Sequence, residues 1–177
     1  MRKYILFTCI RYFEFGLFSI MVFLLAKRIS PAEYGVAASS FILITLSAFL
    51  LLGGNQALVK LHSKEQVTEN KNYLILYNLG SNLLTSIVAF IVLINIAEPL
   101  FAFNVATIGA CKIIVESVAT INRVHQRFNR VNLVYLANII PFSILFFTVD
   151  IKSALGFFQC WSFSLLFSLL VGFITIY

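Results

Sequence analysis

Charged residues are scarce in this chain of 177 residues. Only 11% of its residues are Asp, Glu, Lys or Arg, whereas 60% are hydrophobic and the mean hydropathy is +0.96. Soluble domains typically contain about 25% charged residues, which cover their surface. The composition therefore excludes an ordinary water-soluble domain, and we expect a protein that lies in a lipid bilayer.

Residue types that build catalytic and metal sites are also few. The three cysteines, Cys9, Cys111 and Cys160, lie in apolar segments without paired spacing, so we expect small buried hydrophobic side chains. The histidines, His62 and His125, are far apart in sequence, and nothing near either completes a ligand set. The sequence shows no Gly-rich phosphate loop, no Ser-His-Asp arrangement and no DNA-binding motif. It therefore predicts no enzyme, no cofactor and no nucleic-acid partner.

What the chain has in abundance is long apolar segments. A helix needs about 20 mostly apolar residues to cross a hydrocarbon core of roughly 30 Å. Six segments satisfy this requirement, at residues 4–26, 34–59, 73–97, 99–122, 133–149 and 153–177. The sequence thus predicts an all-α fold, a polytopic membrane bundle of about six transmembrane helices that forms one domain over residues 1–177.

A polar junction separates the first two segments at residues 27–35, KRISPAEYG. Ser30 followed by Glu33 is the pattern of a capping box, and Pro31 falls at the first helical position. A helix is therefore predicted to begin here. Further along, Pro141 is expected to bend the fifth segment, and Asn138 is expected either to hydrogen-bond a neighbouring helix or to face a sugar.

Basic residues are divided unequally between the two sides of the predicted bundle. By the positive-inside rule, the side with more Lys and Arg faces the cytoplasm. This predicts cytoplasmic termini in a multi-pass protein. Eight basic residues lie on the side of the N-terminus, Arg2, Lys3, Lys60, Lys64, Lys71, Arg123, Arg127 and Arg130, and three lie on the other, Lys27, Arg28 and Lys152.

Four charged residues fall inside predicted membrane segments, Arg11 and Glu14 in the first and Lys112 and Glu116 in the fourth. A charge at this depth costs roughly 2.5–3.5 kcal/mol on insertion scales, so such residues are usually paired or line a wet cavity. Each pair has a spacing that places it on one helix face. The two segments run in opposite directions, so Arg11 is level with Glu116, and Glu14 with Lys112.

If these helices touch, we expect two cross-helix pairs of opposite charge, Arg11 with Glu116 and Glu14 with Lys112. Two interpretations stay open. The four residues are either a neutral clamp that joins the helices, or the charged wall of a cavity that meets an anionic lipid headgroup.

Arg123, Arg127 and Arg130 recur at helical spacing after the fourth segment and predict one basic stripe at the cytoplasmic interface. Guanidinium groups match the geometry of phosphate oxygens. Anchoring to acidic membrane lipids is the commoner role of such residues. Both roles remain open for this stripe.

Three motifs together resemble the N-terminal part of bacterial O-antigen and capsule polysaccharide flippases, which belong to the multidrug and oligosaccharidyl-lipid exporter superfamily. They are RYFEFG in the first segment, RISPAEYG before the second and GGNQALVK at its end. The likeness covers roughly residues 5 to 135. Such flippases move undecaprenyl-pyrophosphate-linked oligosaccharides across the inner membrane by alternating access between two six-helix lobes, with basic residues in the central cavity.

The resemblance implies that this chain corresponds to one lobe of a two-lobe transporter, either as the truncated half of a flippase or as a half-transporter that pairs with a second copy or a separate second lobe. Arg11 and Lys112, with Glu14 and Glu116 beside them, are then the cavity residues that meet the lipid-linked oligosaccharide. Two other functions stay open. A multidrug or metabolite antiporter of the same superfamily usually needs an uncompensated acid in the membrane, whereas a non-transporting scaffold of a polysaccharide assembly complex needs no second lobe.

Overall fold

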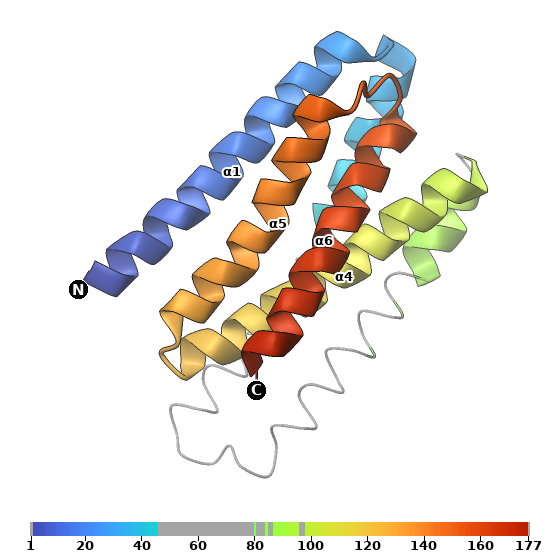
Figure 1. The fold of residues 1–177 in the computed structure, drawn as a ribbon. Coiled ribbons are helices and arrows are strands. Elements are labelled where there is room, and N and C mark those ends of the chain that lie inside the picture. The colour runs from blue at the N-terminus through green and yellow to red at the C-terminus, as the bar shows by residue number, and fades with distance from the viewer. Residues whose placement is uncertain (1, 46–79, 81–83, 85–86, 96–97, 177) are drawn as a thin grey trace.

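The computed structural model describes residues 2–45, 80, 84, 87–95 and 98–176. In this part of the chain the fold is all-α with six helices, as predicted. Residues 31–45 and 87–94 belong to two of them. The other four are α1 (Arg2–Arg28), α4 (Pro99–Val124), α5 (Phe128–Thr148) and α6 (Ala154–Ile176), and Figure 1 shows them as long rods.

Four helices among the described residues are long and apolar enough to cross a membrane. Their candidate spans are Tyr4–Arg28, Pro99–Arg123, Phe128–Thr148 and Ala154–Thr175. They correspond to the first, fourth, fifth and sixth predicted segments, although α5 begins at Phe128 rather than at 133. It also continues through Pro141. The second and third predicted segments fall largely outside the described residues.

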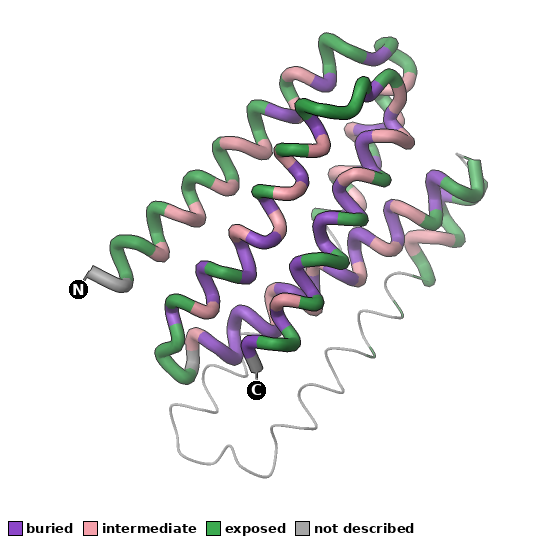
Figure 2. Tube along the Cα trace, in the orientation of Figure 1, coloured by how far each residue is buried: buried purple, intermediate pink, exposed green. Residues whose placement is uncertain are grey.

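The bundle exposes apolar side chains and buries polar ones. Tyr12 and Ile174 are 75% and 76% exposed, whereas Ser164 and Ser168 are fully buried. Figure 2 shows exposed residues along nearly the whole of α1. Water would penalise this distribution, but in a bilayer lipid tails cover the apolar atoms while helix contacts satisfy the polar ones. The arrangement is that of a multi-pass membrane protein.

Helix α6 lies at the centre of the described bundle, where it packs against both α4 and α5, while α1 packs against α5. At Gly172 of α6, an added Cβ would lie 3.2 Å from Val118 of α4, so only glycine permits this close approach without a shift. On the other side of α6, the Ser168 hydroxyl donates a hydrogen bond of 2.8 Å to the Val134 carbonyl of α5. Small and hydroxyl-bearing residues thus fix α6 between its neighbours.

Aromatic rings fill the half of the bundle nearer the 29–30 and 149–153 connections. The Trp161 ring lies 4.7 Å from that of Phe18, and the Phe41 ring lies 5.3 Å from that of Phe158. These contacts connect α1, the helix that contains residues 31–45, and α6. We call the whole group the aromatic cluster; its members are Phe18, Phe41, Phe101, Phe142, Phe146, Phe157, Phe158 and Trp161.

The junction at residues 27–35 closes this end of the bundle. The Ser30 hydroxyl accepts a hydrogen bond from the Glu33 backbone N–H at 3.3 Å, which confirms the predicted cap. The Glu33 carboxylate, which a capping box would direct back to Ser30, instead accepts from the Ala154 N–H at 3.3 Å. It thereby caps the start of α6 rather than its own helix. Nearby, the Arg28 guanidinium donates to the Phe146 carbonyl at 2.9 Å and joins α1 to α5.

Both described ends of the chain lie at the opposite end of the bundle, together with the α4–α5 turn (Figure 1). There the Tyr4 ring of α1 lies 4.6 Å from that of Phe128 in α5. The predicted division of basic residues is confirmed where it is described, because Arg123, Arg127 and Arg130 share this end, whereas Arg28 and Lys152 lie at the other. Lys60, Lys64 and Lys71 lie outside the described residues. Which end faces the cytoplasm stays a prediction.

Candidate functional site

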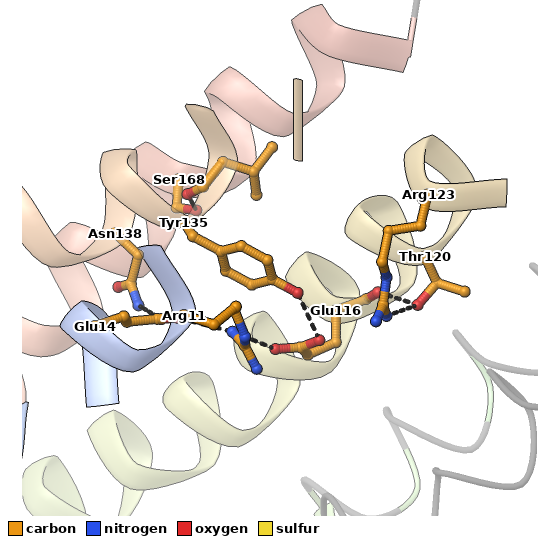
Figure 3. A network of polar contacts seen from close by, with 9 residues as sticks. Arg11, Glu14, Glu116, Thr120, Arg123, Tyr135, Asn138 and Ser168 are labelled. Atoms are coloured by element: carbon orange, nitrogen blue, oxygen red, sulfur yellow. Dashed lines mark hydrogen bonds and ion pairs between the residues drawn. The ribbon is translucent and has the colours of Figure 1, made fainter. Parts of the chain in front are cut away.

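Polar side chains from three helices meet inside the candidate spans, in the half of the bundle nearer the chain ends. Figure 3 shows most of them. We call this group the charged cluster. Its members are Arg11 and Glu14 of α1, Lys112 and Glu116 of α4, and Tyr135 and Asn138 of α5.

Arg11 is the centre of the charged cluster. Its Nη1 lies 2.7 Å from Glu14 Oε2 on the same helix and 3.3 Å from Glu116 Oε1 on α4. Its guanidinium carbon also lies 4.0 Å from the centroid of the Tyr135 ring. The predicted contact between Arg11 and Glu116 is therefore confirmed. One cation serves two carboxylates and an aromatic face, so its charge is well compensated.

Helix α5 binds the remaining oxygen of each acid. The Tyr135 hydroxyl donates to Glu116 Oε2 at 2.9 Å, and the Asn138 amide donates to Glu14 Oε1 at 3.3 Å. Asn138 thus makes an interhelical hydrogen bond, one of its two predicted roles. Tyr135 was not predicted. Tyr135 is 1% exposed, and a buried Tyr hydroxyl needs a polar partner. Its position as a tyrosine inside an apolar segment is the sequence signal that could have identified it.

Lys112 is placed differently from Arg11. Its Nζ lies 5.7 Å from the centroid of the Trp161 ring, at the edge of the aromatic cluster. Glu116 and Glu14 attract it electrostatically, yet it forms no ion pair within 4.0 Å with any described residue. The predicted direct pair of Glu14 with Lys112 is therefore wrong. The reason is that the Glu14 carboxylate already binds Arg11 and Asn138.

The charged cluster is not sealed inside the protein. The side chains of Arg11, Glu14 and Glu116 are 23%, 14% and 29% exposed. Lys112 is also of intermediate burial. These four side chains are therefore partly accessible at the surface of the described bundle. The geometry is compatible with both predicted roles, a helix clamp and a cavity wall.

The predicted basic stripe is not a single helical face. Helix α4 ends at Val124, and the chain reverses through Gln126, whose φ is 56°. The Gln126 N–H bonds the Arg123 carbonyl at 2.9 Å and the Arg127 N–H bonds the Asn122 carbonyl at 2.8 Å. These two bonds are those of a Schellman motif, with glutamine where glycine is usual. The turn therefore separates Arg123 on α4 from Arg130 on α5.

The three arginines also differ in their contacts. Arg123 Nη2 binds the Thr120 hydroxyl at 2.7 Å, and Arg130 Nη1 donates to the Thr175 carbonyl in the last turn of α6. Arg130 thus joins α5 to α6. Arg127 is exposed. Of the three, it is the side chain best placed to meet a lipid headgroup.

The other predicted residues lie apart from the charged cluster or outside the described residues. Cys111 is buried as expected, but Cys9 is exposed, because it lies on the outward face of α1. His125 lies in the exposed α4–α5 turn, whereas His62 lies outside the described residues. The described ranges contain no group of three or more His, Cys, Asp or Glu placed to hold a metal ion.

Comparison with known proteins gives no match: no family model fits the chain, and no curated protein or solved structure is significantly similar to it. The resemblance to flippases therefore rests on the sequence motifs alone. The length and composition of its helices indicate a multi-pass membrane protein with four candidate spans among the described residues.

Proposed function

We propose that this chain is a membrane-embedded lobe of a polysaccharide flippase. In this proposal it binds undecaprenyl-pyrophosphate-linked oligosaccharide and takes part in moving it across the bacterial inner membrane during O-antigen or capsule synthesis. The observation that carries the proposal is Lys112, a cation inside a candidate span that has no carboxylate of the described residues within ion-pair distance. The substrate class comes from the resemblance.

The contacts of the two cations separate their roles in the proposal. Arg11 already binds two carboxylates, so a phosphate would have to displace one of them. Lys112 lies against an aromatic ring, and an anion in direct contact with it would lower the cost of its charge at membrane depth more than Glu14 and Glu116 do from beyond ion-pair distance. A pyrophosphate supplies such an anion and accepts charge-assisted hydrogen bonds. We therefore assign phosphate contact to Lys112, and the alignment of α1, α4 and α5 to Arg11.

The same contacts give less support to an antiporter. Glu14 binds Arg11 and Asn138, and Glu116 binds Arg11 and Tyr135, so each acid has a cation and a hydrogen-bond donor as partners. An acid that carries a coupling ion has to be free to exchange it. In the flippases that the sequence resembles, two lobes enclose the pathway, so we propose that a second copy or a second lobe supplies the wall opposite Lys112.

A binding measurement tests this function. The protein is placed in phosphatidylcholine nanodiscs and titrated with undecaprenyl pyrophosphate, and undecaprenol serves as the uncharged control. We expect Lys112→Ala to weaken binding of the pyrophosphate by about tenfold or more, Lys112→Arg to retain most of it, and neither change to affect undecaprenol. Lys152→Ala is the matched control, because Lys152 is 79% exposed and pairs with Asp150 in the α5–α6 connection. Equal binding by Lys112→Ala and the wild type would contradict the proposal.

A further inference from the structure

Glu116 lies within reach of Lys112 on its own helix but pairs with a residue of another helix. It follows Lys112 by four residues, a spacing that places both side chains on one helix face, although a glutamate pairs better when it precedes the lysine. In the structure the carboxylate is directed elsewhere: Oε1 lies 3.3 Å from Arg11, and Oε2 accepts from Tyr135 at 2.9 Å. Something other than helix geometry therefore decides which cation Glu116 serves.

We infer that Tyr135 is a positioning residue that directs Glu116 to Arg11 and so leaves Lys112 available for an anion. This inference rests on the proposed function, because it concerns the same anion site. The Tyr135 hydroxyl donates to one oxygen of the Glu116 carboxylate, and the other oxygen pairs with Arg11. The guanidinium carbon of Arg11 lies 4.0 Å from the centroid of the Tyr135 ring. One side chain thus holds both partners of the ion pair that joins α1 to α4.

The tyrosine hydroxyl is the second partner of the Glu116 carboxylate. Tyr135 is 1% exposed, so its hydroxyl is held against Glu116 rather than solvated. Without the hydroxyl, Glu116 Oε2 loses this donor and is free to turn to another. Lys112, one helical turn away, is a cation that it can reach by rotating its side chain. A carboxylate drawn to Lys112 would compete with a phosphate for the ammonium group.

Tyr135→Phe tests the inference because it removes the hydroxyl and retains the ring. In phosphatidylcholine nanodiscs we expect this variant to bind undecaprenyl pyrophosphate roughly three- to tenfold more weakly than the wild type. In a Glu116→Gln background the same change should have little effect, because no carboxylate remains to be redirected. A merely structural role of Tyr135 would weaken binding equally in both backgrounds, and that result would overturn the inference. Tyr12→Phe, on the exposed face of α1, is the matched control for loss of a hydroxyl.

A second measurement without ligand separates this inference from the proposed function. Melting temperatures of Lys112→Ala, Glu116→Gln and the double variant give the coupling between the two residues. We expect the coupling to be clearly larger in Tyr135→Phe than in the wild type, where Glu116 attracts Lys112 only from beyond ion-pair distance. If the wild type fails to bind the pyrophosphate but the coupling increases in Tyr135→Phe, the proposed function is wrong and the positioning role stands. If binding depends on Lys112 and the coupling does not increase, the positioning role is wrong.

Discussion

The two halves of this bundle are joined by different interactions. In the half nearer the 29–30 and 149–153 connections, the rings of the aromatic cluster pack at centroid distances such as 4.7 Å between Phe18 and Trp161. In the half nearer the chain ends, Arg11 joins two acids, and Tyr135 and Asn138 hold those acids in place. Most of these rings contact several others, whereas each acid depends on two specific partners.

The difference shows where this protein can tolerate change. Ring contacts depend on shape and contact area, so a lost ring leaves a cavity but no uncompensated charge. A lost charge partner leaves an ion at membrane depth, where its solvation is poor. The aromatic half therefore mainly stabilises the bundle. The charged half carries specific interactions that a ligand can enter or disrupt.

The largest effect is expected in the aromatic half. Phe157 is fully buried and lies 5.2 Å from Phe142 and 5.8 Å from Phe41. Phe157→Ala should lower the free energy of unfolding by about 4 kcal/mol, from the cavity and the lost ring contacts. Phe163→Ala on the same helix is the control, since Phe163 is 60% exposed and should cost far less. Unfolding in mixed micelles measures both, and equal losses would mean that the aromatic cluster does not stabilise the bundle.

The second effect concerns the charged half and is asymmetric. Arg11→Ala removes the cation shared by Glu14 and Glu116, so we expect a loss of about 3 kcal/mol. Glu116→Ala should cost less, about 1–2 kcal/mol, because Arg11 keeps Glu14 as its partner and the main loss is the hydrogen bond of the buried Tyr135 hydroxyl. The same unfolding assay compares the two variants. A larger loss for Glu116→Ala would show that Arg11 is not the centre of the charged cluster.

The smallest effect concerns the turn that sets α5 beside α4. Gln126 has a φ of 56°, a conformation that costs a residue with a Cβ about 1 kcal/mol more than glycine. Gln126→Gly should therefore stabilise the protein by up to about 1 kcal/mol. Asn129→Gly, at an exposed position in the first turns of α5, should instead destabilise it. If both substitutions shift the melting temperature in the same direction, the turn geometry is not as described.

The sequence predicted those features that depend on the helix repeat alone. Counting the rise along two helices of opposite direction was enough to place Arg11 level with Glu116, and the Ser30 cap followed from local backbone needs. Tyr135 could not be predicted in this way, because its contact depends on how α5 is rotated about its axis. The pair of Glu14 with Lys112 failed because Arg11 and Asn138 already bind the Glu14 carboxylate. Gln126 shows a further limit, since no glycine or proline marks the turn that it forms.

Two double-mutant cycles test the central claim, that Arg11 is paired across the helices and Lys112 is not. The first cycle combines Arg11→Ala with Glu116→Ala, and the second combines Glu14→Ala with Lys112→Ala, with the free energy of unfolding measured in mixed micelles. We predict a coupling of about 1–3 kcal/mol in the first cycle and within about 0.5 kcal/mol of zero in the second. Equal couplings, or a larger coupling between Glu14 and Lys112, would contradict the arrangement of the charged cluster and the assignment of Lys112 to an anionic ligand.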